Sequence, residues 1–176
     1  MQRYLTVHGH FYQPPREDPA NGRIPREPGA APFHDYNEKI LAECYRPNAK
    51  QGSFASMSFD IGPTLGLWMR RRHPLVLDEI VASDRDSVMR AGYGNALMQS
   101  FHHTILPLAS QRDRLTELRW GRRWFEHTFG RTPAGIWLPE TAVDLATLEA
   151  CAAEGLWFTI LSPEQAEQAA GPIEPG

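Results

Sequence analysis

The residues best suited to catalysis or binding lie where strand-like stretches of the sequence end. The apolar run 135–138 leads through Pro139 to a single carboxylate, Glu140, and a helix start follows at once. The first apolar run of the chain leads to His8 and His10, two imidazoles that are two residues apart. Enzymes of the α/β class present catalytic groups at the carboxyl ends of strands. Packing alone is a poor explanation for a carboxylate and two imidazoles in such positions.

Further polar side chains follow the other strand-like stretches. Asp60 ends the second stretch, and His102 and His103 follow the third. Because the carboxyl ends of parallel strands meet at one face, this recurrence is a stronger signal than any single residue. Taken singly, Asp60 is better explained as the cap of the helix near residue 63, and Glu140 as a carboxylate at the positive end of a helix dipole. Three other histidines are expected at the surface: His34, His73 and His127.

The elements that must position these residues alternate between strand and helix. Patterning predicts strands over 3–8, 54–59, 95–101, 134–138 and 156–161, and helices over 34–46, 64–72, 74–90, 111–129 and 145–154. Asp35 and Asp144 are expected as N-caps, and Gly130 and Gly155 as helix ends. The proline-rich segment 13–33 is a long connection of the kind that lines a site or moves.

Alternating strands and helices predict right-handed crossovers and a mostly parallel sheet. About four or five strands fit into 176 residues, whereas a complete (β/α) barrel needs about 250 residues. The expected fold is therefore α/β, either a small open sheet or the first half of a barrel. Residues 1–162 form this unit, and residues 163–176, rich in Glu, Ala, Pro and Gly, are expected to be a disordered or truncated tail.

Composition and charge narrow the class of protein. A hydrophobic fraction of 41% and a charged fraction of 22% are ordinary for a soluble globular domain. A net charge of −3 and a pI near 6.2 give no support to binding of nucleic acid or of anionic membranes. No apolar run reaches the ~18–20 residues that span a bilayer, and no signal peptide is visible. The two cysteines, Cys44 and Cys151, lack metal-type spacing, and a cytoplasmic location is the simplest interpretation.

One chemistry that the imidazoles and the carboxylate could supply is metal binding. His8 and His10 point to the same side of a strand, and with His103 and Glu140 they would make a zinc set that leaves a position for water. His-x-His alone is not specific, however, and no His-x-x-x-His spacing supports a metal. Nucleophilic serine or cysteine chemistry has no anchor, since no Gly-x-Ser-x-Gly occurs.

Three segments resemble the signatures of glycoside hydrolase family 57. The run His8-Gly-His-Phe-Tyr-Gln13-Pro-Pro resembles the first signature, in the form carried by a subgroup of bacterial members. His103-Thr-Ile-Leu-Pro-Leu resembles the second histidine segment, and Gly135-Ile-Trp-Leu-Pro-Glu resembles the segment that carries the nucleophile. The three occur in the family's order across residues 4–161.

This resemblance implies an incomplete seven-stranded (β/α) barrel, of which the chain forms the N-terminal part, and retaining chemistry on α-linked glucans without a cofactor or metal. It assigns Glu140 as the catalytic nucleophile. Substrate binding falls to residues of the same signatures: His8, His10, Gln13, His103 and Trp137. The chemistry agrees, because imidazoles that donate hydrogen bonds would help keep an attacking carboxylate ionised, and an indole face covers the C–H side of a sugar.

The family's acid/base aspartate lies on a later strand, and no residue of this chain matches its position. Asp144 is expected as a helix cap, and Glu164 matches nothing in the pattern. The sequence thus predicts a nucleophile-bearing fragment that is nearly inactive alone, since general acid–base catalysis is worth about 10²–10⁴-fold. The exposed sheet edge should bind the C-terminal remainder of the enzyme or a second copy.

Two alternative functions remain beside the glycosidase. One is a metal-dependent hydrolase of the carbohydrate deacetylase or amidohydrolase type, which would use His8, His10 and His103 as ligands. The other is a non-catalytic module that binds carbohydrate.

Overall fold

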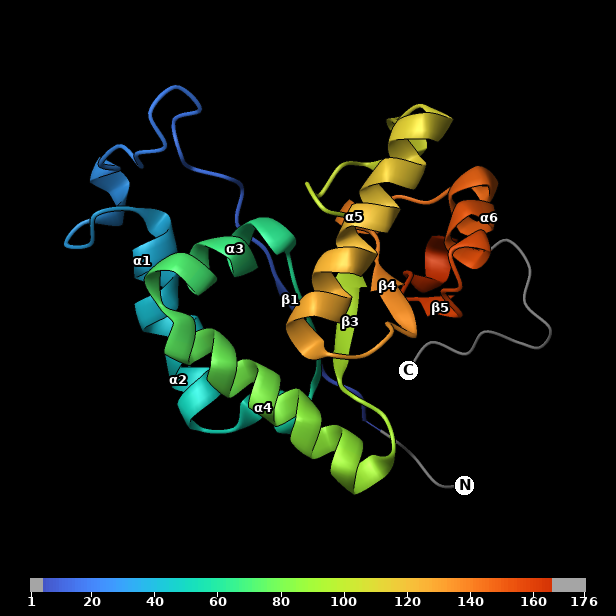
Figure 1. Ribbon diagram of the computed structural model, residues 1–176, viewed down its shortest axis with the longest axis horizontal. Coiled ribbons are helices and arrows are strands. Elements are labelled where there is room, and N and C mark those ends of the chain that lie inside the picture. Colours follow the sequence, from blue (N-terminus) through green and yellow to red (C-terminus); the bar gives the residue numbers. More distant parts are fainter. Residues whose placement is uncertain (1–4, 166–176) are drawn as a thin grey trace.

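The computed structural model describes residues 5–165, which form an α/β fold around one parallel sheet (Figure 1). Five strands lie in sequence order, each parallel to the next: β1 (His8–Phe11), β2 (Ser58–Ile61), β3 (Ala96–Gln99), β4 (Gly135–Trp137) and β5 (Phe158–Thr159). The predicted α/β class with a parallel sheet is confirmed. The predicted tail falls from residue 166 onward outside the described residues, and Pro163–Gln165 forms a 3-10 turn.

Six helices connect the strands: α1 (Tyr36–Ile40), α2 (Arg46–Lys50), α3 (Pro63–Arg72), α4 (Pro74–Ala91), α5 (Gln111–Phe129) and α6 (Leu145–Ala153). The four predicted helices from 64 onward are confirmed to within about one residue at each end. The caps act as expected, because Asp35 accepts from the Glu38 N–H at 3.1 Å and Asp144 accepts from the Thr147 N–H at 2.7 Å. Gly130 ends α5 with a φ of 69°.

The predicted helix 34–46 is wrong at its C-terminal end. A π-helical turn over Leu41–Tyr45 joins α1 to α2, and helical structure continues through Pro47 to Lys50. Pro47 is tolerated because it lies in the first turn of α2, where a missing backbone N–H costs little.

The first two strands also differ from their predicted ranges. β1 begins at His8 instead of ending there, because its ladder with β2 starts at the pair of His8 and Ser58. Leu5 and Val7 lie before the sheet with exposed side chains, and residues 3 and 4 of the predicted strand lie outside the described part. Phe54, the first residue of the second predicted strand, is buried in a 3-10 turn, and the strand itself starts four residues later.

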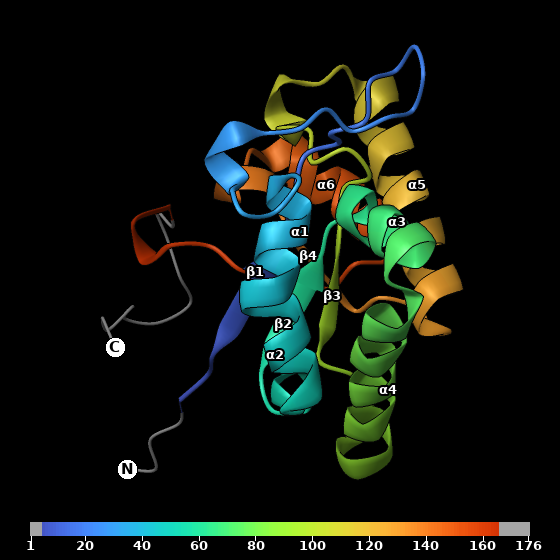
Figure 2. The same cartoon turned by 90° about the vertical axis from the view of Figure 1, so that its left-hand side faces the viewer.

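The hydrophobic core lies between the sheet and the helices that cover it (Figures 1 and 2). Helices α3, α4 and α5 contact one another, and α5 packs on β3. Trp68 of α3 and Trp124 of α5 are buried in this core, whereas Trp120 of α5 is 52% exposed. Among residues 5–165, no helix combines the length and apolar character needed to cross a membrane.

The segments that follow β1 and β3 lie together at one end of the sheet, the upper end in both views (Figures 1 and 2). Register aligns His10 of β1 with Asp60 of β2, and Gln99 of β3 with Trp137 of β4. Four neighbouring strands therefore carry polar or aromatic side chains close to their carboxyl ends, which is where the sequence placed the candidate site.

Candidate active site

Asp60 is fully buried near the carboxyl end of β2 and joins the two imidazoles of β1. Its Oδ1 lies 2.9 Å from His8 Nε2, and its Oδ2 lies 2.9 Å from His10 Nδ1. The interpretation of Asp60 as a helix cap is wrong, because Gly62 occupies the N-cap of α3 and receives no side-chain hydrogen bond there. The carboxylate instead faces β1, its neighbour in the sheet. The other nitrogen of His8, Nδ1, lies 2.9 Å from Ser58 Oγ.

Gln99, at the end of β3, links Asp60 to a third imidazole. Its amide nitrogen donates to Asp60 Oδ2, and its amide oxygen lies 2.9 Å from His103 Nδ1. Gln99 is fully buried. Gly62 leaves room for it, since a Cβ at that glycine would lie 3.0 Å from Gln99 Oε1 and 2.9 Å from Tyr12 Cδ2.

Five rings stack into one continuous wall beside these hydrogen bonds, which we call the ring wall: His8, Trp137, His10, His103 and Tyr12. The Trp137 ring lies 4.9 Å from both the His8 and the His10 rings, at angles of 11° and 21°. His10 stacks on His103 at 5.2 Å, and His103 on Tyr12 at 3.8 Å. Aromatic faces of this kind present an apolar surface with polar edges, which suits a sugar ring.

Glu140 lies next to the ring wall in a short 3-10 turn, Pro139–Thr141, that follows β4. Its side chain is 72% exposed, and its Oε1 lies 3.7 Å from His103 Nε2. The explanation of Glu140 as a helix-start carboxylate is wrong, because α6 begins five residues later and its cap is Asp144.

Three residues at this end of the sheet adopt left-handed backbone conformations although none is glycine. His103, Glu140 and Thr141 have φ values of 58°, 54° and 52°. A left-handed conformation costs an L-residue about 1–2 kcal/mol, and such strain concentrates at functional sites. The backbone thus holds the carboxylate and its nearest imidazole in positions that relaxed turns would not supply.

Burial sets the electrostatics of the ring wall. Burial lowers the pKa of His103 below its usual value, and the neighbouring His10 lowers it further, whereas Glu140 and Asp60 act in the opposite direction. Burial raises the pKa of Tyr12, and the Glu140 charge adds to this. The neutral forms of both rings are therefore favoured near neutral pH.

Two buried polar atoms in the ring wall have no hydrogen-bond partner among residues 5–165. They are His103 Nε2 and Trp137 Nε1, and both face the same group of rings. Buried polar atoms are nearly always paired with protein, water or ligand. The two rings lie on opposite sides of His10, and an unpaired nitrogen on each is an arrangement expected where a polar ligand binds.

Two residues from the sequence analysis do not join the ring wall. Gln13 forms hydrogen bonds away from it, donating to the Tyr45 hydroxyl at 3.3 Å and accepting from Arg16 Nη2 at 2.9 Å. Burial raises the pKa of Tyr45 to about 12, so this hydroxyl stays protonated. His102 turns toward α5, where its Nδ1 lies 2.7 Å from Glu117 Oε1.

The zinc interpretation gains no support from this geometry. Both ring nitrogens of His8 already face Ser58 and Asp60, and His103 Nδ1 faces Gln99. Within the described range, no three His, Cys, Asp or Glu side chains converge in a way that suits a metal ion.

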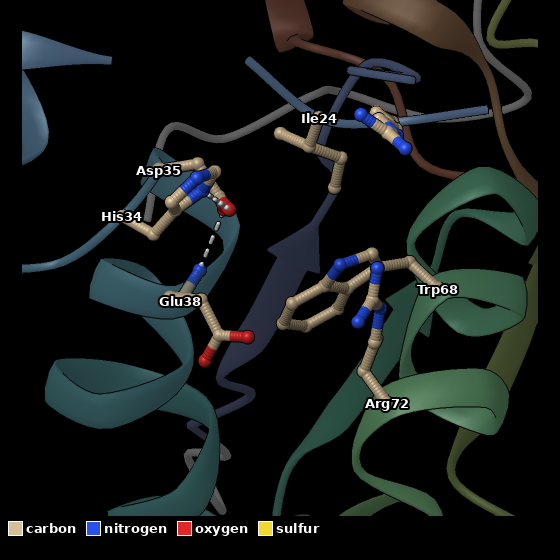
Figure 3. Close-up of a pocket in the computed structure, with 7 residues that line it drawn as sticks. Ile24, His34, Asp35, Glu38, Trp68 and Arg72 are labelled. Atoms are coloured by element: carbon tan, nitrogen blue, oxygen red, sulfur yellow. Dashed lines mark hydrogen bonds and ion pairs between the residues drawn. The ribbon is translucent and has the colours of Figure 1, made fainter. Parts of the chain in front are cut away.

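A separate cavity of about 330 Å³ lies between α1, α3 and the loop that precedes α1 (Figure 3). Its acidic side chains are already engaged, because Asp35 caps α1 and Glu38 lies 3.0 Å from His73. His34 is mostly exposed as predicted, while His73 is only 22% exposed. None of the ring-wall residues lines this cavity, so the candidate active site remains at the end of the sheet.

Sequence reasoning missed Asp60, Gln99 and Tyr12 as members of the site. Tyr12 lay inside the first signature, and Asp60 was noted but explained as a cap. Gln99 offered one signal that could have been used, because it is a polar residue at the end of an otherwise apolar strand, Ala96–Gln99.

Comparisons with known proteins bear on the fold and the family of the chain. The chain resembles alpha-amylase 1 of Dictyoglomus thermophilum, with 22% identity over 96 residues, which cover 54% of this chain and 13% of the amylase. Its fold is similar to that of a 4-alpha-glucanotransferase from Thermococcus litoralis, with a TM-score of 0.63 at 17% identity, over 88% of this chain and 21% of that one.

An alpha-amylase from Thermotoga maritima has a similar fold, with a TM-score of 0.62 at 14% identity, over 92% of this chain and 40% of the amylase. The chain thus spans well under half of the length of these relatives. The model for glycosyl hydrolase family 57 matches residues 5–169. Since this match covers nearly the whole chain, the chain belongs to glycosyl hydrolase family 57.

Proposed function

We propose that this chain carries the nucleophile-bearing part of a retaining glycoside hydrolase or transglycosylase that acts on α-glucans. Family membership supports the class of enzyme, and the relatives named as amylases and a glucanotransferase support α-glucan as the substrate. The observation that carries the proposal is the juxtaposition of an exposed carboxylate, Glu140, with the ring wall at the carboxyl end of the sheet.

In this proposal Glu140 attacks the anomeric carbon of the sugar that rests against the ring wall. The bond to the leaving sugar oxygen breaks while a second carboxyl group, about 5–5.5 Å from the first, gives that oxygen a proton. Water or the hydroxyl of another sugar then attacks the glycosyl–enzyme ester. Attack by water is hydrolysis, and attack by a sugar hydroxyl is transfer.

The ring wall supplies the binding subsite for the attacked sugar. Its faces can cover the C–H side of the ring. Trp137 Nε1–H offers one donor, and His103 Nε2 in its neutral form offers one acceptor, for sugar hydroxyl groups. Gln13 contributes indirectly, because it joins the loop after β1 to Tyr45 and accepts from Arg16 within that loop.

Asp60 is not a candidate for the proton donor, because it is fully buried and already accepts from three N–H groups. We assign the acid/base role to a carboxyl group of a longer enzyme, of which residues 1–162 would form the N-terminal portion of the barrel. The share of the solved relatives that the chain covers, 21% and 40%, supports this assignment. The remainder would pair with an exposed sheet edge.

A cytoplasmic location completes the proposal. Cys44 and Cys151 are both free thiols, which suits a reducing compartment. Burial raises the pKa of both, that of Cys151 to about 11, so neither is an activated nucleophile.

The decisive experiment replaces the nucleophile in the protein as its gene encodes it. Glu140→Gln should lower kcat on maltooligosaccharides at least about 10³-fold, because the covalent route is lost. In Glu140→Ala, added azide should restore turnover of an activated α-glucoside and give a β-glycosyl azide. The exposed Glu149 on α6 provides the matched control, and Glu149→Gln should keep full activity. Normal activity of Glu140→Gln on every α-glucan that the parent cleaves would refute the nucleophile assignment.

Retention can be measured separately. Proton NMR of the first product should show the α-anomer before mutarotation. A β-anomer as the first product would require an inverting mechanism and a different role for Glu140.

A further inference from the structure

Asp60 meets only hydrogen-bond donors. Three N–H groups converge on its two carboxylate oxygens: His8 Nε2, His10 Nδ1 and Gln99 Nε2. A carboxylate can only accept, so every group that faces it must present a proton. Since Asp60 is fully buried, no water from bulk solvent can relax this requirement.

Through Gln99, this requirement also determines which nitrogen of His103 carries the proton. The amide of Gln99 must turn its NH₂ group toward Asp60, and its oxygen therefore faces His103 Nδ1 at 2.9 Å. An amide oxygen can only accept, so Nδ1 of His103 must carry the proton. In the neutral ring the other nitrogen, Nε2, then holds a lone pair, and this is the atom that lies 3.7 Å from Glu140 Oε1. The orientation of the Gln99 amide itself follows from the acceptor-only character of the carboxylate.

We propose that Asp60 and Gln99 are positioning residues that fix the tautomers of His10 and His103, so that both neutral rings carry their proton on Nδ1. His10 donates from Nδ1 to Asp60, and its Nε2 is left as an acceptor in the same way as that of His103. The ring wall therefore presents two imidazole acceptors and one indole donor.

This arrangement changes what the histidines do at the nucleophile. Neutral His103 cannot donate to Glu140, and its separation of 3.7 Å from the carboxylate is longer than a hydrogen bond. Its lone pair is buried and has no donor among residues 5–165, so a sugar hydroxyl that reaches Nε2 would donate to it. This consequence for substrate rests on the proposed function, whereas the tautomers themselves do not.

The test measures the tautomers directly in the chain of 176 residues. Long-range ¹H–¹⁵N correlation spectra should be recorded about 1.5 pH units above the usual histidine pKa of about 6.5, where neutral rings dominate. In the wild-type chain, His10 and His103 should each show a protonated Nδ1 and an unprotonated Nε2, with at least about a tenfold preference. A protonated Nε2 on neutral His103 in the wild-type chain overturns the inference without any variant.

Asp60→Asn sharpens the test, because asparagine offers one acceptor and one donor where three donors converge. If its amide nitrogen faces Gln99 and His10, Gln99 must turn or His10 must change its tautomer, and a turned Gln99 moves the His103 proton to Nε2. If its amide nitrogen faces His8, the His8 proton must leave Nε2. A folded Asp60→Asn chain in which all three rings keep their protonated nitrogens would contradict the proposal.

Gln99→Met addresses His103 alone, because it removes the acceptor from Nδ1 while preserving the length of the side chain. The preference of His103 for a protonated Nδ1 should be lost or reversed, and an unchanged preference would count against the role of Gln99. Glu117→Gln is the matched control, since it alters a buried carboxylate that faces the adjacent His102. It should change the His102 signals and leave those of His103 in place.

The two proposals fail separately. Tautomers as stated together with an active Glu140→Gln protein would refute the nucleophile and leave the positioning role of Asp60 and Gln99. The reverse result, an inactive Glu140→Gln protein with a His103 proton on Nε2, would refute the positioning role only.

Discussion

Asp60 and Glu140 are carboxylates near the carboxyl ends of two strands of the same sheet, yet their surroundings are opposite. Asp60 is fully buried and meets three N–H donors, whereas the Glu140 side chain is 72% exposed and its nearest cation-forming group is 3.7 Å away. The backbone of Glu140 is strained and that of Asp60 is regular strand. Environment divides the roles of two carboxylates in an enzyme. In our proposal the buried carboxylate positions the histidines, and the exposed one is the nucleophile.

The largest expected effect on stability comes from removing the buried carboxylate. Asp60→Ala should lower the free energy of unfolding by about 3–5 kcal/mol, because three buried donors lose their acceptor. Urea unfolding followed by tryptophan fluorescence measures the change. Asp78 on α4 is the control, since its pair with Arg70 is exposed and Asp78→Ala should cost less than about 1 kcal/mol. A loss at Asp60 as small as that at Asp78 would remove the contrast.

A smaller effect is expected from filling the space beside Gln99. Gly62→Ala places a Cβ 2.9 Å from Tyr12 Cδ2 and 3.0 Å from Gln99 Oε1. The φ of Gly62 is −60°, so the backbone itself accepts alanine. We expect a loss of about 1–3 kcal/mol from overpacking, together with displaced ring-current shifts of His103 in the proton NMR spectrum. Unchanged His103 shifts would show that Tyr12 and Gln99 yield without disturbing the ring wall.

A change of the opposite sign in the free energy of unfolding is expected at the exposed carboxylate, Glu140. Glu140→Gly should raise the free energy of unfolding by about 0.5–1 kcal/mol, because glycine adopts the φ of 54° without steric cost. Glu149→Gly on α6 is the comparison, and it should lower stability by about 1 kcal/mol, as glycine does in helices. If Glu140→Gly also destabilises the chain, the strain at Glu140 is not a cost that the fold carries.

The smallest expected effect is the contribution of His103 to the pH dependence of stability. Its pKa is lower in the folded chain than its usual value, so the unfolded chain binds more protons in this window. Stability should therefore rise with pH through the range just below about 6.5 and fall on acidification. His103→Asn, which suits a φ of 58°, should flatten this dependence when urea midpoints are compared at about pH 5.5 and 7.5. An equal slope in both proteins would assign the dependence to other groups.

The parts of the fold that sequence predicted are those that local interactions determine. The helix 111–129 is marked by its own apolar stripe and by the Gly130 that follows it, and the structure repeats these bounds. Strand ends were less well predicted, because the ladder of β1 depends on a partner about 50 residues away. The run at Leu5 and Val7 looks like a strand, but the pairing of β1 with β2 starts only at His8, after a single backbone hydrogen bond from Ser58 to Val7.

The residues of the candidate site also fall into two groups, those predicted from the local sequence and those whose role depends on distant partners. Glu140, His8, His10, His103 and Trp137 were predicted from strand ends and a resemblance, and the structure places them together. Asp60 was misassigned because an aspartate before Gly-Pro looks like a helix cap when its partner strand is unknown. Gln99 carried too little signal, because a buried amide acquires its role only from the two side chains that it connects.

The π-helical turn over Leu41–Tyr45 accommodates one more residue than a regular α-helical turn does. Deleting one residue between 41 and 44 would restore regular α-helical pairing and leave the flanking segments close to their present orientation, whereas a deletion in a regular turn rotates one segment against the other by about 100°. Tyr45 would then stay within reach of Gln13. A one-codon deletion should therefore be tolerated in this turn and should displace the loop after β1 when it falls in a regular helical turn beside it.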